Sequence, residues 1–129
     1  MAEPFKVLVL NQIATVGLKR LPHEQYTVGK DVPNPDAILV RSADMHAIDI
    51  PASVRAIARA GAGTNNIPVK AMSARGVPVF IAPGANANAV KELVLAGMLM
   101  AARNLPGALH FVSTIDAADA QMDARVEEG

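Results

Sequence analysis

The sequence predicts an α/β protein built on a doubly wound parallel sheet of about five strands, with a C-terminal helical arm. Two observations predict this fold. Over residues 5–81, short and mostly apolar runs alternate with loop and helix patterns, as in strands buried on both faces of a parallel sheet. Past Asn88, two helical patterns follow with no strand after them. Strands that alternate with helices favour a parallel sheet with right-handed crossovers.

Each strand is predicted from a short apolar run, and the five runs cover residues 5–10, 26–28, 37–40, 54–60 and 77–81. Residues 12–20 can form a short helix despite Gly17, and the prolines within residues 31–36 make a loop. Pro68 suits the first turn of a helix that runs to Ala74, and Gly76 suits its C-cap. Because Pro78 cannot donate to a ladder, the fifth strand should lie at an edge or begin irregularly.

Two helical patterns make up the rest of the chain. Residues 89–104 carry apolar side chains nearly all round the helix, so this helix should be buried on most sides. Pro106-Gly107 should interrupt it. A second, amphipathic helix is predicted from apolar residues at spacings of four, three, four and four: Phe111, Ile115, Ala118, Met122 and Val126. Its polar face is acidic, with Asp116, Asp119, Asp123, Glu127 and Glu128.

Composition excludes several classes of function. The chain has 129 residues, which favours one core, and Lys plus Arg equals Asp plus Glu at twelve each. No net field therefore draws it to nucleic acid or to a membrane surface. The absence of cysteine excludes disulfides and thiolate chemistry. We expect no signal peptide, and the apolar run 93–102 is too short to cross a bilayer.

A run of small residues at 60–63 is the first candidate site. Gly61-Ala-Gly63 begins like a dinucleotide fingerprint, but Asn66 stands where its last glycine should be, and the loop follows a fourth strand. A dinucleotide site is therefore rejected here. Without large side chains, the backbone can approach a ligand closely and point N–H groups at a carboxylate. A tight turn between strand and helix is the alternative on spacing alone.

Three polar residues are further candidates. Arg41 and Arg59 lie at the ends of predicted strands, where a guanidinium can bind phosphate or carboxylate or can simply be solvated. Asn86 precedes a helix and suits a cap or turn, although Asn88 is the better cap candidate. The three histidines, His23, His46 and His110, share no ligand-like spacing, so they are assigned neither catalysis nor metal binding.

Four segments together resemble the substrate-binding domain of the D-2-hydroxyacid dehydrogenases: residues 40–42, 59–67, 74–81 and 83–92. Within this family they are most similar to the members that oxidise D-3-phosphoglycerate. The resemblance implies a flavodoxin-like sheet, a substrate-binding domain over residues 1–104 and, over residues 105–129, a helical arm leading toward an NAD-binding domain outside this sequence. It also implies a cytoplasmic protein.

The resemblance implies roles for eight residues in substrate binding. Main-chain N–H groups of the 60–63 loop would hold the substrate carboxylate, Arg41 and Ser42 would contact phosphate or carboxylate, Arg59 would contact substrate or secure the loop, and Asn86 would project toward the substrate. The loop residues are Ala60, Gly61, Ala62 and Gly63. Ala62 stands where some relatives place a hydroxyl near the nicotinamide. The family's catalytic arginine, glutamate and histidine and its NAD loop fall beyond residue 129, so none is carried over.

The function implied for the parent enzyme is NAD-dependent oxidation of 3-phosphoglycerate, or of another 2-hydroxy acid. We expect this chain alone to bind no NAD, to turn over no substrate and to form a homodimer through residues 89–126. A stand-alone α/β binding or oligomerisation module is the alternative. A phospho-acceptor receiver domain is excluded, because it needs acidic residues where Asn11 and Arg41 stand.

Overall fold

The computed structural model describes residues 3–116, 118 and 120–128, and it consists of two compact units. The first unit extends to Ala85, and the second begins at Asn86.

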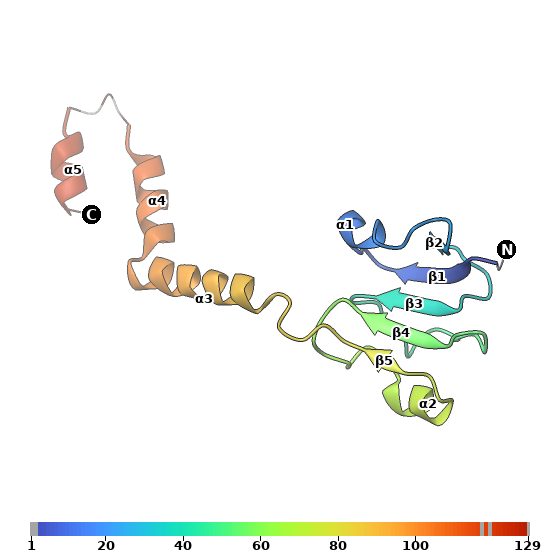
Figure 1. The fold of residues 1–129 in the computed structure, drawn as a ribbon. Coiled ribbons are helices and arrows are strands. Elements are labelled where there is room, and N and C mark those ends of the chain that lie inside the picture. Colours follow the sequence, from blue (N-terminus) through green and yellow to red (C-terminus); the bar gives the residue numbers. More distant parts are fainter. Residues whose placement is uncertain (1–2, 117, 119, 129) are drawn as a thin grey trace. The chain divides into compact units, whose positions relative to one another are not determined.

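The first unit is a parallel sheet of five strands, which are labelled in Figure 1. Its strands are β1 (Phe5–Leu10), β2 (Tyr26–Gly29), β3 (Ala37–Val40), β4 (Ala56–Arg59) and β5 (Val79–Phe80). The order β2-β1-β3-β4-β5, with every pair parallel, confirms the predicted flavodoxin-like sheet. β5 is an edge strand that begins after Pro78, as that proline requires.

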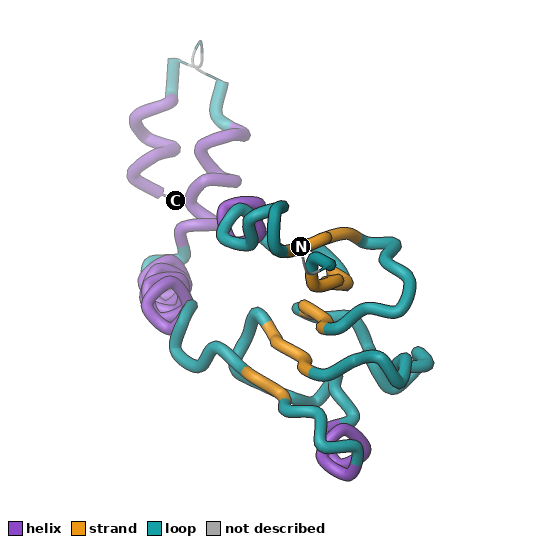
Figure 2. Tube along the Cα trace, turned by 45° about the vertical axis from the view of Figure 1, so that its right-hand side comes forward, coloured by secondary structure: helices purple, strands orange, loops and turns teal. Residues whose placement is uncertain are grey.

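Two short helices belong to this unit, and Figure 2 shows that most of its remaining chain is loop. α1 (Thr15–Leu18) is much shorter than the predicted 12–20, since Ala14 at its N-cap makes no capping bond and Gly17 lies inside it. α2 (Val69–Ala74) ends at the predicted Ala74, and Gly76 follows its C-cap residue Arg75 with φ +71°. The N–H groups of Gly76 and Val77 donate back to Ser73 and Met72, which is a Schellman closure.

The direction of the crossovers makes the sheet doubly wound. The chain moves from β1 through α1 to β2 on one side, and from β4 through α2 to β5 on the other. Right-handed crossovers therefore place α1 and α2 on opposite faces of the sheet.

The core of the first unit forms around β3, β4 and α2. The β3 to β4 connection contains no helix, yet it supplies buried Met45, Ile50 and Val54 to the cluster. The other buried members are Ile38, Val40, Ile57, Ile67, Met72 and Val77. Because these buried side chains hold the central strands in place, the loops at the carboxyl ends of the strands begin at fixed positions.

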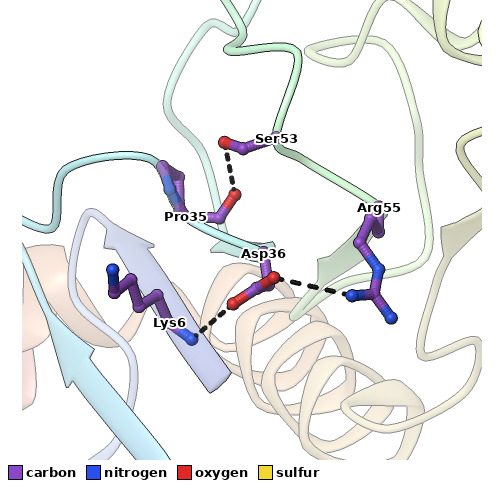
Figure 3. Close-up of polar contacts among 5 residues, drawn as sticks. All are labelled: Lys6, Pro35, Asp36, Ser53 and Arg55. Atoms are coloured by element: carbon purple, nitrogen blue, oxygen red, sulfur yellow. Dashed lines mark hydrogen bonds and ion pairs between the residues drawn. The ribbon is translucent and has the colours of Figure 1, made fainter. Parts of the chain in front are cut away.

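The amino ends of three strands are joined through one carboxylate, as Figure 3 shows. Oδ2 of Asp36 accepts the N–H of Lys6 at 2.8 Å, and Oδ1 lies 3.7 Å from Nη1 of Arg55. The N–H of Arg55 also donates to the carbonyl of Asp36 at 2.8 Å, and the hydroxyl of Ser53 donates to the carbonyl of Pro35 at 2.9 Å. These contacts hold β1, β3 and β4 together at the edge opposite their carboxyl ends.

The second unit contains α3 (Ala87–Ala102), α4 (Leu105–Thr114) and α5 (Met122–Glu128). The predicted interruption at Pro106-Gly107 is wrong, because the break falls at Asn104, which has φ +45°. Pro106 instead occupies the first turn of α4, where no N–H is needed. Gly107 allows the Asn104 side chain to approach the backbone of α4 closely, since a Cβ at position 107 would lie 2.7 Å from Nδ2 of Asn104.

The single amphipathic helix predicted over 111–126 is also wrong, because α4 ends at Thr114 and Ile115 is extended. The hydroxyls of Ser113 and Thr114 donate to carbonyls three residues back, and Asp116 accepts the N–H of Ala118. Such local bonds compete with helix formation. Asp119, assigned to the acidic face, lies outside the described residues.

Helix α3 has no buried residue, contrary to the expectation that most of its sides would be covered. Leu93, Met98 and Leu99 are 73%, 63% and 66% exposed. Within the second unit, α4 contacts α3 but leaves this apolar surface exposed. No helix among the described residues is both long and apolar enough to cross a membrane.

Candidate functional site

The carboxyl ends of the parallel strands bring four loops to one edge of the sheet. Leu10 pairs with Val40, and Val40 pairs with Arg59, so the segments after β1, β3 and β4 begin at the same level. Lys30 follows β2 beside them. In open α/β sheets, ligands bind in the crevice outside this edge, where the strand order reverses. Here the reversal falls between β1 and β3.

Arg41 lies at this reversal with a side chain that forms no hydrogen bond or ion pair within the described residues. It lines a cavity of about 480 Å³, together with Lys30, Asn11 and Gln12. It also lines a second cavity of about 270 Å³, together with Asn11, Gln12 and Ser42. The larger cavity has two cationic side chains and no acidic one in its lining. This arrangement suits an anionic group.

The glycine loop offers main-chain donors at the neighbouring strand. The N–H of Ala60 donates to the carbonyl of Val40 at 2.8 Å, so it is already occupied. Those of Gly61, Ala62 and Gly63 have no acceptor within the described part of the chain. Ala82 donates to the carbonyl of Gly61 at 2.9 Å, which fixes the start of the loop. Three of the four predicted donors are thus available to a ligand.

Arg59, the last residue of β4, lies against this loop and joins it to the loop after β3. Its Nε donates to the carbonyl of Arg41 at 2.9 Å. Its Nη1 is buried and has no partner among the described residues, and a Cβ added at Gly63 would lie 2.7 Å from it. An unpaired buried donor costs about 1–3 kcal/mol. Pairing this group needs an acceptor that the described residues do not supply.

Three polar residues of this edge were missed from the sequence. Asn11 accepts the N–H groups of Ser42, at 3.2 Å, and of Ala43. Asn66 is 8% exposed, and its Nδ2 donates to the carbonyl of Ala43 at 2.8 Å. Lys30 lines the larger cavity. Its place two residues after the predicted strand 26–28 was the available signal, as the end of a predicted strand was for Arg41.

Asn86 belongs to the second unit and occupies the N-cap position of α3 without a side-chain capping bond. Asn88 is not the cap that was expected, because it lies inside the helix. Its Nδ2 donates to Oε1 of Glu92 at 2.8 Å, and its Oδ1 accepts from Nζ of Lys91 at 2.5 Å. Contact between Asn86 and a substrate stays a prediction.

The histidines are placed apart. His23 lies 3.1 Å from Glu24 on the surface, and Nε2 of His46 lies 3.2 Å from the carbonyl of Asn65. His110 belongs to α4. Among the described residues, no three His, Asp or Glu side chains form a group that could hold a metal ion.

Comparison with known proteins gives one family and several relatives. The family model described as "D-isomer specific 2-hydroxyacid dehydrogenase, catalytic domain" matches residues 5–127. D-3-phosphoglycerate dehydrogenase of Mycobacterium tuberculosis is 42% identical over 80 residues, which are 60% of this chain and 15% of that protein. The protein of the same name from Archaeoglobus fulgidus is 40% identical over 82 residues, 61% of this chain and 16% of that protein.

A relative of another name also matches. Hydroxypyruvate reductase of Thermotoga maritima is 39% identical over 79 residues, 59% of this chain and 26% of that protein. The chain therefore spans only a minor part of the length of the relatives that it matches.

Proposed function

Because the chain belongs to the D-isomer specific 2-hydroxyacid dehydrogenases, through their catalytic domain, we propose that it forms the substrate-binding side of an NAD-dependent dehydrogenase. The reaction proposed for the whole enzyme is oxidation of 3-phospho-D-glycerate to 3-phosphohydroxypyruvate, in cytoplasmic L-serine biosynthesis. The names of the M. tuberculosis and A. fulgidus relatives support this substrate.

The observation that carries the proposal is the pairing of two anion-binding features at one edge of the sheet. The free N–H groups of Gly61, Ala62 and Gly63, beside unpaired Nη1 of Arg59, suit a carboxylate. The cavity lined by Arg41 and Lys30 suits a phosphate. A substrate with a carboxylate at one end and a phosphate at the other engages both.

The role of this chain is then to orient carbon 2 of the substrate between its two anionic ends. The whole enzyme would bind NAD, which would supply the acceptor for the hydride from that carbon. A general base takes the hydroxyl proton, and we assign that base to no residue of this chain. The Arg59 guanidinium neutralises the carboxylate while it holds the loop through the carbonyl of Arg41.

Titrations with two ligands test the substrate assignment. We expect the chain to bind 3-phosphoglycerate more tightly than D-glycerate, and Arg41→Ala to weaken 3-phosphoglycerate binding about ten- to a hundredfold while leaving glycerate binding nearly unchanged. NMR titration measures even weak binding. Arg20→Ala is the matched control, since Arg20 is exposed and lines neither cavity. Equal losses of affinity for both ligands would show that Arg41 does not contact the phosphate. Tighter binding of D-glycerate than of 3-phosphoglycerate would favour a substrate without phosphate.

We also propose that the chain alone neither binds NAD nor turns over phosphoglycerate. The 129 residues contain no Gly-x-Gly-x-x-Gly run, and the resemblance to the family assigns its catalytic arginine, glutamate and histidine to no residue of this chain. Calorimetry with NAD and a steady-state assay measure both properties. Turnover that follows the purified chain through every fraction would contradict this proposal.

A homodimer through residues 89–126 is the last part of the proposal, and the exposed apolar residues of α3 support it. Val94, Leu95 and Leu99 are 54%, 51% and 66% exposed, and contiguous apolar surface of this kind is unusual in a monomer. Twofold pairing covers it without starting an open fibre. Light scattering over a dilution series should show a dimer that Leu95→Glu and Leu99→Glu dissociate.

The control is Lys91→Glu, a charge change at a polar position of the same helix. A stable monomer at high protein concentration would defeat the dimer. It would leave the alternative of a binding module without self-association.

A further inference from the structure

The segment that carries Arg41 is held from both neighbouring strands. Nε of Arg59, at the end of β4, donates to the carbonyl of Arg41. On the other side, Oδ1 of Asn11, directly after β1, accepts the N–H groups of Ser42 and Ala43. Since these are consecutive N–H groups, a single side-chain oxygen orients the peptide that follows Arg41.

Asn11 has a backbone conformation suited to this contact. Its φ is +66°, in the left-handed region that non-glycine residues enter rarely and asparagine more often than most. The side chain is exposed and contributes nothing to the hydrophobic core. Packing therefore does not explain why asparagine stands here, whereas the two hydrogen bonds to the Arg41 loop do.

We propose that Asn11 is a positioning residue for anion binding, which acts by fixing the backbone beside Arg41 so that the guanidinium faces the cavities that both residues line. This inference rests on the proposed function of the same edge. Without the Asn11 acceptor, the loop samples more conformations, and Arg41 loses orientation entropy each time it binds an anion.

The amide suits this role better than a carboxylate. An aspartate at position 11 also accepts both N–H groups, but it adds a negative charge to a cavity whose cations are Lys30 and Arg41. The neutral amide provides the same acceptor and leaves the attraction for an anion intact. Position 11 therefore combines two separable properties, an acceptor and an absence of charge.

Two substitutions separate these properties. Asn11→Gly keeps the positive φ without strain and removes the acceptor. Asn11→Asp keeps the acceptor and adds the charge. Asn34→Gly is the matched control, because Asn34 also has a positive φ, +49°, and lines neither cavity. All three are compared with the unchanged chain by urea unfolding, amide hydrogen exchange and NMR titration with 3-phosphoglycerate and with inorganic phosphate.

For Asn11→Gly we expect faster exchange at the amides of Ser42 and Ala43 and a Kd for 3-phosphoglycerate raised about three- to tenfold, the worth of one or two hydrogen bonds. This loss should persist at high salt. For Asn11→Asp we expect the amides of Ser42 and Ala43 to stay protected and 3-phosphoglycerate to bind more weakly. This loss of affinity should become smaller at high salt, because salt screens the added charge. Asn34→Gly should change neither the two amides nor the affinity.

The inference is overturned if Asn11→Gly binds 3-phosphoglycerate as the unchanged chain does, or if its two amides stay protected. An unchanged chain that binds neither 3-phosphoglycerate nor phosphate overturns the proposed function, and the inference with it. If Asn11→Gly does not fold, Asn11→Asp decides: protected amides with a salt-dependent affinity loss support the inference, and exposed amides overturn it.

Discussion

Gly63→Ala should uncouple the glycine loop from the Arg41 loop. A Cβ at position 63 would lie 2.7 Å from Nη1 of Arg59 and 3.2 Å from Oδ1 of Asn65, closer than heavy atoms pack without displacement. The guanidinium is the group that has to move, because it is the end of a flexible side chain. Its Nε bond to the carbonyl of Arg41, 2.9 Å long, is then lost or lengthened.

The size of the effect follows from these contacts. Overpacking costs about 1–3 kcal/mol where neighbours cannot relax, and a lost hydrogen bond to a charged donor costs a similar amount. Because the Arg59 side chain is only partly buried and can shift, we expect the lower half of this range, about 1–2 kcal/mol. Gly61→Ala is the matched control, since its Cβ would meet Arg59 at 3.6 Å, an ordinary contact.

Urea unfolding of the chain measures the loss of stability, and NMR titration with 3-phosphoglycerate measures the effect on binding. Gly63→Ala should lower the unfolding midpoint and weaken binding, whereas Gly61→Ala should change the midpoint little. If Gly63→Ala is as stable as Gly61→Ala and binds equally well, Arg59 does not couple the two loops.

Three further changes test the framework around the site by urea unfolding. Asp36→Ala should lower the free energy of unfolding by about 1–3 kcal/mol, because the N–H of Lys6 loses its acceptor. It should leave the affinity for 3-phosphoglycerate unchanged, and a changed affinity would contradict the separation of the two edges. Gly76→Ala should cost about 1–2 kcal/mol, because an L-residue is strained at φ +71°, and a neutral result would exclude the Schellman closure. Gly17→Ala should stabilise by about 0.5–1 kcal/mol, because nothing lies within 4 Å of its Cβ position in α1; a loss would show that the helix needs this glycine.

The sheet could be predicted because its strands are short apolar runs bounded by loop residues. β1 and β3 have the predicted bounds, and Pro78 correctly indicated an edge strand. The helices were predicted less well, since α1 is a single turn and the arm breaks at Asn104 and Ile115. The first break lies at the left-handed backbone of Asn104, φ +45°, and the second follows the local bonds of Ser113 and Thr114, and apolar periodicity registers neither.

Half of the candidate site could be read from residue type, and the other half depended on contacts between distant segments. Arg41 and the glycine loop follow strands, so their edge was predictable. Asn11 and Asn66 bind backbone groups 31 and 23 residues away in the sequence. Nothing near either asparagine in the sequence indicates such a partner. For the same reason, the N–H of Ala60 was expected to be open to a substrate, whereas the carbonyl of Val40 accepts it.

The two edges of the sheet differ in how completely their polar groups are paired, and this difference itself argues for a binding role. At the amino edge, Asp36 pairs with main-chain and side-chain donors. Among the described residues, the only buried side-chain atoms without a partner are Nη1 of Arg59 and Oδ1 of Asn66, and both belong to the carboxyl edge and its loops. Each buried polar atom without a partner lowers the stability of the fold. Nη1 of Arg59 and the three free N–H groups are all donors, so an anion at this edge would supply the acceptor that they share, whereas Oδ1 of Asn66 is an acceptor and lines neither cavity.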